Sequence, residues 1–234
     1  MPRPDSSRRE VVEMFDRISP TYDLLNRVFS LGVDRCWRSR AIRALGLRPG
    51  AQLLDCSAGT GDMALRALRE CAAVEPVLYD PAREMLVRAG TKLRRASQDR
   101  GRLTQGVAEA IPFPDGIFDH FTVAFGIRNF SDLARGLAEL HRTLRTDGVG
   151  VILEFTPDRS ALIDRLFRTY MWAVMRPLGA LISRDRKAYG YLARTVAGFP
   201  VTSRLTDLFR QVGFREVKAT PLSLGIATQF LLRK

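Results

Sequence analysis

The sequence predicts an α/β fold in which a doubly wound, mostly parallel seven-stranded sheet carries helices on both faces. From residue 51 onward, short apolar runs alternate with helical stretches, which is the pattern of parallel strands joined by crossover helices. A glycine-rich turn follows the first run, at the edge where such sheets bind ligands. The last two apolar runs are too close together for a crossover helix, so they predict a terminal antiparallel β-hairpin.

The elements are expected in the following order. Residues 5–46 read as three N-terminal helices that form a lid, with breaks at Pro20 and Gly32. Residues 158–212 form a helical insertion before the sixth strand. The chain is therefore expected to be a single domain, 1–234, in which a βα core at 51–157 lies between lid and insertion and a terminal hairpin at 213–234 follows. The expected strands are 51–56, 77–80, 103–107, 118–127, 150–155, 214–220 and 225–232.

The composition is that of a globular chain, since 46% of the 234 residues are hydrophobic and 26% are charged. The formal charge is +12, but the basic excess is arginine spread along the chain without a nucleic-acid-binding motif, so no nucleic-acid partner is expected. Neither a run of about 18 apolar residues nor an apolar N-terminal stretch occurs, so neither a membrane span nor a secretory signal is predicted. The three scattered cysteines argue against a disulfide framework or a metal site and favour a cytoplasmic protein.

The strongest local signal is the run 55–64, DCSAGTGDMA, at the end of the first strand. Gly59 and Gly61 lie where the strand turns into a helix, and glycine there permits a tight turn and close approach of the backbone to a ligand. Asp80 lies at the end of the second strand, from where a carboxylate can accept both hydroxyls of an adenosine ribose. The alternative is an ordinary βα turn followed by an ordinary acid at the start of a helix.

Charge distinguishes the nucleotides that such a turn could bind. The run from Gly59 to Ala64 also satisfies the G-x-G-x-x-A pattern of dinucleotide sites, which leaves NAD as the alternative. A dinucleotide requires an unencumbered helix N-terminus for its pyrophosphate, whereas Asp55 and Asp62 flank this turn. S-adenosylmethionine instead carries a sulfonium and an ammonium group, which two carboxylates would stabilise. The turn therefore favours S-adenosylmethionine.

Several blocks distributed over the chain resemble the menaquinone/ubiquinone C-methyltransferase family, from about residue 11 to about residue 226. The first of them together with FGIRN is more specific than the glycine turn, which many methyltransferases share. The blocks are 14–26, MFDRISPTYDLLN; 30–37, SLGVDRCW; 108–115, AEAIPFPD; 125–129, FGIRN; 153–155, LEF; 189–192, YGYL; and 199–200, FP.

The resemblance implies a class I S-adenosylmethionine-dependent methyltransferase with a Rossmann-like sheet. The chain departs from the family at Val107, where Asn or Asp is frequent, so only backbone groups remain there to contact the adenine. Further departures are Ser57 in place of glycine, Ala124 in place of serine, and a tail after Ile226 without the usual His-Arg pair. Thr60, Asp80, Val107, Ala108 and Ala124 are the cofactor residues that the resemblance implies, and with the turn the predicted site is Asp55, Gly59, Thr60, Gly61, Asp62, Asp80, Val107, Ala108 and Ala124.

The resemblance also implies a quinol acceptor, with Tyr22, Arg128 and Asn129 as the catalytic residues. A ring carbon becomes nucleophilic when a neighbouring hydroxyl ionises, and for a phenol of pKa ~10 this costs about 4 kcal/mol at pH 7. The Arg128 cation would stabilise the quinolate, while Asn129 and Tyr22 would orient the ring oxygens. On spacing alone, Tyr22 could instead be a core residue, and Asp23 and Arg27 a plain surface pair.

The segment 165–182 combines large apolar and aromatic residues with arginines, as helices at a lipid headgroup interface do. An isoprenoid quinol is a membrane lipid, and the chain has no predicted span. The segment therefore predicts peripheral association with an anionic membrane, on the inner face of the cell membrane. The alternatives are a helix packed in the core and a contact between the two subunits of a homodimer.

The sequence thus predicts an enzyme that transfers a methyl group from S-adenosylmethionine to a ring carbon of a demethylated isoprenoid naphthoquinol, with menaquinol as the product. A benzoquinol of ubiquinone biosynthesis or another small molecule is the alternative acceptor. The alternative of another class is a nucleotide-binding or regulatory module without catalysis, which the departures at Val107 and Ala124 and in the tail would favour.

Overall fold

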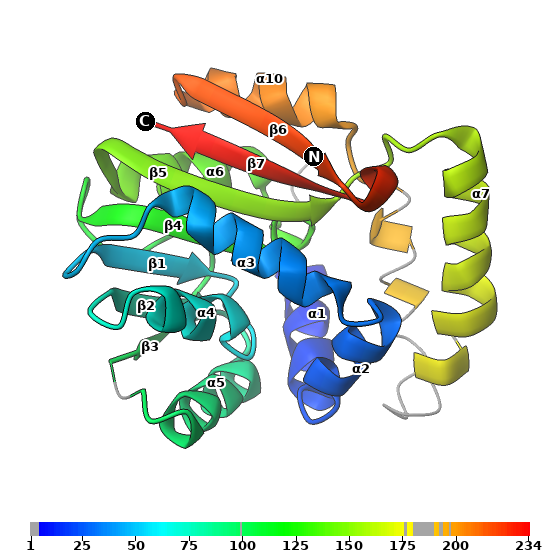
Figure 1. The fold of residues 1–234 in the computed structure, drawn as a ribbon, viewed down its shortest axis with the longest axis horizontal. Coiled ribbons are helices and arrows are strands. Elements are labelled where there is room, and N and C mark those ends of the chain that lie inside the picture. Colours follow the sequence, from blue (N-terminus) through cyan, green and yellow to red (C-terminus); the bar gives the residue numbers. More distant parts are fainter. Residues whose placement is uncertain (1–4, 99, 176, 180–189, 192–193, 197) are drawn as a thin grey trace.

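The computed structural model describes residues 5–98, 100–175, 177–179, 190–191, 194–196 and 198–234. The strands are β1 (Gln52–Cys56), β2 (Glu75–Asp80), β3 (Arg102–Gln105), β4 (Phe118–Ala124), β5 (Leu144–Phe155), β6 (Glu216–Leu222) and β7 (Ala227–Arg233). They form one sheet in the order β3-β2-β1-β4-β5-β7-β6 (Figure 1). The first five strands pair in parallel, and β7 pairs antiparallel with both β5 and β6. The predicted fold class, including the terminal hairpin, is confirmed.

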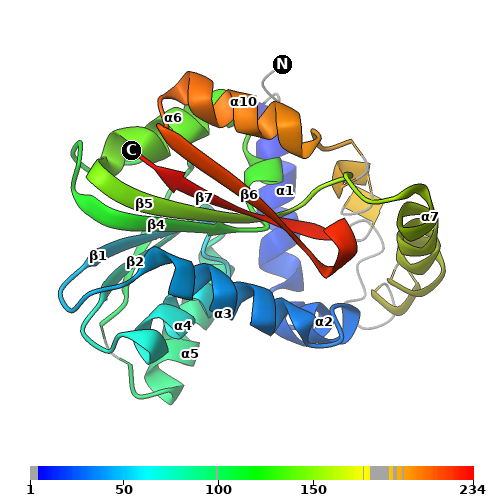
Figure 2. The same ribbon diagram turned by 45° about the horizontal axis from the view of Figure 1, so that its top comes forward.

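Helices cover both faces of the sheet, as Figures 1 and 2 show: α3, α4 and α5 lie on one face and α6 and α10 on the other. The α-helices are α1 (Asp5–Ile18), α2 (Tyr22–Phe29), α3 (Val33–Leu45), α4 (Asp62–Glu70), α5 (Arg83–Arg95), α6 (Leu133–Thr143), α7 (Ala161–Tyr170) and α10 (Thr202–Val212). Shorter helical turns are η1 (Ile127–Asn129), η2 (Met171–Met175) and η3 (Ser223–Gly225).

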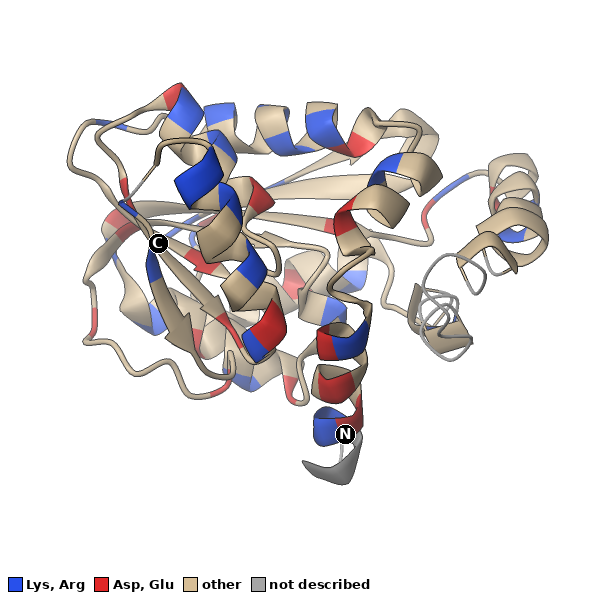
Figure 3. Cartoon of the chain, turned by 90° about the horizontal axis from the view of Figure 1, so that it is seen from below, with Lys and Arg blue, Asp and Glu red and all other residues tan. Residues whose placement is uncertain are grey.

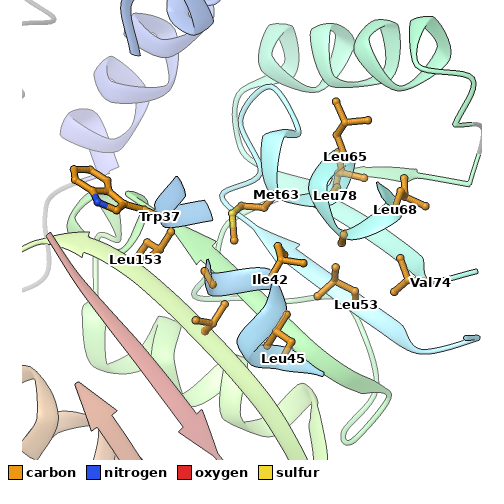
Figure 4. Packing of buried hydrophobic residues seen from close by; sticks show 14 of the residues in the cluster. Trp37, Ile42, Leu45, Leu53, Met63, Leu65, Leu68, Val74, Leu78 and Leu153 are labelled. Atoms are coloured by element: carbon orange, nitrogen blue, oxygen red, sulfur yellow. The ribbon is translucent and has the colours of Figure 1, made fainter. Parts of the chain in front are cut away.

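Two apolar clusters hold the helices on the sheet. In the first, Ile42 of α3 and Met63 and Leu68 of α4 pack against Leu53 of β1 (Figure 4). The second joins α6 and α10 to the opposite face, and Phe209 of α10 is fully buried in it. The predicted insertion 158–212 therefore ends in a helix that packs on the sheet, whereas none of the residues of α7 is buried. The division of the chain into segments stays a prediction.

Strand β4 ends earlier than expected. The predicted strand 118–127 stops at Ala124, because Phe125 adopts a left-handed conformation with φ 60° and the chain then enters η1. A side chain at Gly126 would lie 2.5 Å from the Cβ of Ser57, so the two loops that follow β1 and β4 are in close contact. The end of this apolar run is thus a buried loop at the ligand-binding edge of the sheet.

The other strands also differ from their predicted bounds, by one or two residues except for β5. β3 ends two residues before the end of the predicted 103–107, since Gly106 lies against the hydroxyl of Tyr79, where no side chain would fit. β5 begins six residues before the predicted 150–155. Residues 147–148, Asp-Gly, have the composition of a turn, and an irregularity lies there inside the strand: Asp147 has φ 61°, and the register with β4 shifts.

Helices α1, α2 and α7 lie beyond the carboxyl ends of the parallel strands, whereas α3, the third helix of the predicted lid, packs on the sheet (Figures 1 and 2). α1 contacts α5, where the side chain of Asp16 accepts a hydrogen bond of 2.8 Å from the N–H of Glu84. α7 reaches α2 through the hydroxyl of Tyr170, which donates to the carbonyl of Phe29 (3.1 Å). Among the described residues, no helix is long and apolar enough to cross a membrane. Figure 3 shows Lys and Arg spread over several helices, with Asp and Glu between them.

Candidate active site

Two neighbouring cavities open at the carboxyl ends of the parallel strands. The smaller, about 80 Å³, lies between the ends of β2 and β4 and the helix α1. The larger, about 390 Å³, lies between α1, α2, α3 and α7. Phe15, Tyr22 and Phe125 line both cavities, so the two share a wall. Because open α/β sheets bind their ligands at this edge, the pair of cavities can hold a donor beside an acceptor.

Asp80 lines the smaller cavity at the end of β2. Its two carboxylate oxygens accept hydrogen bonds of 2.8 Å from the backbone N–H groups of Gly59 and Ala82. Burial raises the pKa of Asp80 to about 6, although these two hydrogen bonds oppose the shift. Each oxygen keeps a further lone pair, so Asp80 can hold the glycine turn and still accept a ligand hydroxyl.

Four other predicted cofactor residues line the same cavity: Gly59, Val107, Ala108 and Ala124. The carbonyl of Val107 accepts a hydrogen bond of 3.0 Å from the hydroxyl of Tyr79, which fixes the backbone after β3. The apolar side chains of Val107 and Ala124 leave backbone groups to recognise a base at this wall.

The remaining predicted cofactor residues, Asp55, Thr60, Gly61 and Asp62, line neither cavity and support the turn instead. Asp55 is buried, and it accepts hydrogen bonds from the Thr122 hydroxyl (2.8 Å) and the Ala64 N–H (3.1 Å). Burial raises the pKa of Asp55 to about 7. Asp55 thus ties the end of β1 to β4 and to the first turn of α4.

Lys92 of α5 joins the turn to the lid. Its Nζ lies 2.6 Å from the carboxylate of Asp62 and 2.6 Å from that of Asp23, and it donates to the Thr60 hydroxyl (3.0 Å). Burial would raise the pKa of Asp62, but the Arg38 and Lys92 cations lower it. Asp55 and Asp62 are therefore not two unpaired carboxylates facing a bound cation, as expected from the sequence: Asp55 is enclosed, and Asp62 is paired with Lys92. Their roles toward the cofactor stay predictions.

The glycine turn requires glycine at position 61, because neighbouring side chains leave no room for a Cβ there. Gly61 has φ 79°, and a side chain there would lie 2.9 Å from Leu78 and 3.0 Å from Ala89 of α5. Ser57, one of the departures expected from the resemblance, also adopts a left-handed conformation, with φ 55°. This departure therefore keeps the backbone path at the cost of local strain.

Arg128 lines the larger cavity from η1. Its Nη1 lies 2.6 Å from Oε1 of Glu154, a fully buried residue of β5, and the Arg128 side chain is itself buried. Burial raises the pKa of Glu154, although the Arg128 cation opposes this. The positive charge expected to face the substrate is thus offset from behind by a carboxylate.

The structure separates the three predicted catalytic residues. Tyr22 and Arg128 both line the larger cavity, together with Asn26, which lies one turn after Tyr22 on α2. Asn129 lines the smaller cavity, and its side-chain oxygen accepts a hydrogen bond of 2.9 Å from the Tyr191 hydroxyl. Residues 189 and 192 of the same sequence block lie outside the described residues.

Two buried charges of α3 were missed by the sequence reasoning. Asp34 and Arg38 line the larger cavity, and Nε of Arg38 donates to Asp34 (3.4 Å), which also accepts from the Ser30 hydroxyl (2.6 Å). Their four-residue spacing on a helix with an apolar face is the signal that could have revealed them. Glu154 was missed too, although an acid near the end of an apolar strand marks the ligand-binding edge.

Comparison with known sequences agrees with this geometry. The model of the ubiE/COQ5 methyltransferase family matches residues 4–234. A protein named ubiquinone/menaquinone biosynthesis C-methyltransferase UbiE from Geotalea uraniireducens is 42% identical over 228 residues, which cover 96% of each chain. A demethylmenaquinone methyltransferase from Deinococcus radiodurans is 44% identical over 218 residues, or 93% of this chain and 89% of that one.

Solved structures share the fold. The [4+2]-cyclase SpnF superposes with a TM-score of 0.73 at 17% identity, covering 100% of this chain and 98% of that one. A SAM-dependent methyltransferase from Aquifex aeolicus gives a TM-score of 0.61 at 15% identity, over 84% and 88% of the two chains. A cyclase among these neighbours means that the fold alone does not determine the reaction. The family match, by contrast, spans nearly the whole chain, and on that evidence the chain belongs to the ubiE/COQ5 methyltransferase family.

Proposed function

We propose that this chain transfers the methyl group of S-adenosylmethionine to a ring carbon of a demethylated isoprenoid naphthoquinol, with menaquinol as the product. Its family makes it a methyltransferase, and its relatives carry the names of C-methyltransferases of quinone biosynthesis. The observation that carries the proposal is the wall shared by the two cavities at Phe15, Tyr22 and Phe125. A donor in the smaller cavity and an acceptor in the larger one would meet at this wall.

The smaller cavity suits the adenosyl part of the cofactor, which when bound supplies an electrophilic methyl group on its sulfonium. The Val107 and Ala108 backbone would face the adenine, Asp80 would accept the ribose hydroxyls, and Gly59 would let the backbone approach. At about 80 Å³ the cavity is far below the ~300–1,000 Å³ of ordinary ligand sites. Because α1 forms its outer wall through Arg8 and its neighbours, we expect α1 to move outward when the cofactor binds.

The larger cavity suits the quinol. Its lining is mainly apolar and aromatic, which would accommodate an isoprenoid chain. Arg128 and Tyr22 place polar groups in the same lining, where they would contact the ring oxygens. Because Glu154 offsets the charge of Arg128, the guanidinium would act on a ring oxygen chiefly as a hydrogen-bond donor. It would then lower the pKa of the quinol less than an isolated cation would.

The test is incubation with methyl-labelled S-adenosylmethionine beside two acceptors, demethylmenaquinol and the demethylated benzoquinol precursor of ubiquinol. Label in the naphthoquinol supports the proposal, whereas label in the benzoquinol alone assigns the chain to the alternative acceptor. Binding of S-adenosylhomocysteine without transfer to either quinol would support the non-catalytic alternative. The apolar side chains at Val107 and Ala124 make that control worthwhile.

We further propose that the mouth of the larger cavity rests on an anionic membrane. Large apolar side chains are exposed on α7, on η2, in the turn between α2 and α3, and on η3, which lie at one end of the molecule (Figures 1 and 2). Leu31, which is 84% exposed, also lines the larger cavity. Arg165 and Arg168 are exposed on α7. Residues 176 and 180–182 of the predicted membrane segment lie outside the described residues.

Vesicle sedimentation tests this placement. Trp172 is 71% exposed on η2, so Trp172→Ser should reduce binding to phosphatidylglycerol vesicles, while Leu103→Ser on β3 should leave it unchanged. Added salt should weaken the binding, because charges on the surface are screened beyond ~10 Å. Equal binding to neutral and anionic vesicles would contradict the electrostatic part. Self-association that Trp172→Ser abolishes, without any vesicle binding, would assign the surface to a homodimer instead.

A further inference from the structure

Arg38 is a buried cation at the junction of the two cavities. Its side chain lies on α3, is 8% exposed and lines the larger cavity. The guanidinium carbon lies 5.4 Å from the centre of the Phe125 ring, which borders both cavities. Burial alone would lower the pKa of Arg38, but the carboxylates of Asp62, Asp34 and Asp55 raise it. Arg38 is therefore charged, and its field reaches the glycine turn.

The terminal nitrogens of Arg38 are available to a ligand. Within the described part of the chain, its hydrogen bond runs from Nε to Asp34, and no residue there accepts from Nη1 or Nη2. Other cations near the cavities are engaged through their terminal groups. Nη1 of Arg128 lies 2.6 Å from Glu154, and Nζ of Lys92 lies between two carboxylates. Arg38 thus presents a planar pair of donors, the geometry that matches a carboxylate.

We propose that Arg38 binds the α-carboxylate in the methionyl part of S-adenosylmethionine. This inference rests on the proposed position of the adenosyl part in the smaller cavity. From Asp80 a ligand tail would pass Gly59 and continue toward the wall shared with the larger cavity. Tyr22, which belongs to that wall, lies close to Gly59: a Cβ on this glycine would be 4.0 Å from the Tyr22 ring. Arg38 stands beyond that wall beside Phe125.

The chemistry of the methionyl end favours such a cation. Its carboxylate would lose water when the ligand is enclosed between the two cavities, so a cation that still has donors to offer would stabilise it. Asp55 and Asp62, which flank the turn in the sequence, both interact electrostatically with Arg38. Asp34 holds Nε from behind and so orients the two terminal nitrogens.

The test compares two ligands that differ only in the carboxylate: S-adenosylhomocysteine and its decarboxylated analogue, which keeps the adenosine, the sulfur and the amine. Calorimetry measures both affinities for the wild type, for Arg38→Gln and for Arg38→Lys. Arg38→Gln should weaken the binding of S-adenosylhomocysteine about 10- to 100-fold, as loss of a charged hydrogen bond does. The affinity for the decarboxylated analogue should not change. Arg38→Lys should fall between, because an ammonium lacks the planar fork.

A matched control is Arg43→Gln on the same helix, where Arg43 is exposed and pairs with Glu70 (3.6 Å). It should change neither affinity. Equal weakening of both ligands by Arg38→Gln, or no weakening of either, would overturn the proposal. So would unchanged affinities with a raised KM for the quinol, which would place Arg38 against the acceptor.

Two further variants keep the result interpretable. If Arg38→Gln does not fold, because Asp34 is left buried without its partner, the double variant Asp34→Asn/Arg38→Gln removes both charges and is compared with Asp34→Asn. The same difference between the two ligands is expected. Asp80→Asn should weaken both ligands alike, since both carry the ribose. If Asp80→Asn weakens neither, the proposed cofactor position fails, whatever Arg38 does.

Discussion

Removing the carboxylate behind Arg128 tests whether this ion pair is a buried structural unit. In Glu154→Gln the side chain keeps its shape, but Arg128 loses the negative charge that lies 2.6 Å from its Nη1. Both residues are buried, Glu154 completely, so water does not reach the position of the removed charge on the β5 side of Arg128. Breaking a buried pair in this way costs about 3–5 kcal/mol. Against a total stability of about 5–15 kcal/mol, that is a major loss.

Removing both charges should reverse most of the loss. In Arg128→Met/Glu154→Leu no buried charge remains, and apolar replacement of a buried pair is often neutral or stabilising. About 1 kcal/mol should stay lost, because the N–H of Phe155 donates to Glu154 (2.9 Å) and would have no acceptor there. Turnover should not return, since Arg128 is the proposed donor to the quinol oxygen.

The assay is urea unfolding of the wild type, Glu154→Gln, Glu154→Leu, Arg128→Met and the double variant Arg128→Met/Glu154→Leu, with initial rates of naphthoquinol methylation on the same samples. The cycle uses the wild type, Glu154→Leu, Arg128→Met and the double variant. The free energies of unfolding form a double-mutant cycle whose coupling term measures the pair. A Glu154→Gln variant as stable as the wild type would refute the buried-pair reasoning. A double variant with full turnover would remove Arg128 from the reaction.

Three further predictions follow from the described contacts. In the folded protein the pKa of Asp55 is raised to about 7, so the native state binds more protons than the unfolded state between about pH 4 and 7, and stability should fall as pH rises through this range. Asp55→Asn should reduce that slope by up to ~1.4 kcal/mol per pH unit in urea titrations. Gly61→Ala should cost about 2–4 kcal/mol in the same unfolding assay, from its positive φ and its clash with Ala89. Lys92→Met should release Asp23 from the glycine turn and speed hydrogen exchange in α2, whereas unchanged exchange would show that the lid is held elsewhere.

Local chemistry explains why most of the fold could be predicted. α3 begins after the predicted break at Gly32 and ends before Gly46, because these two glycines flank it with φ 78° and 63°, which glycine adopts without strain. The end of β4 could not be predicted in this way. Phe125 continues an apolar run, yet it leaves the strand to stack on Phe155 at 4.7 Å. An apolar residue in a buried loop has the same pattern as one in a strand.

The location of the candidate site could be predicted from the sequence, but the partners of its charged side chains could not. Gly59, Asp80 and Arg128 follow strands, and the ends of parallel strands meet at one edge of the sheet. Arg128 and Glu154, by contrast, are 26 residues apart in the sequence. They meet because β4 and β5 are neighbours in the sheet. Lys92 is likewise far in sequence from both of its acids. Spacing along the chain reveals only partners on the same helix, such as the pair on α3.

The wall shared by the two cavities has a kinetic consequence. Phe15 and Tyr22 belong to the lid helices, so displacing α1 to admit the cofactor also opens a wall of the acceptor cavity. If the wall closes again only over the bound cofactor, the quinol would find a stable binding surface only after the cofactor is in place. Turnover would then follow a compulsory order, with the donor entering first and its demethylated form leaving last. In steady-state kinetics that product would inhibit competitively against the donor, and raising the quinol concentration would not relieve it.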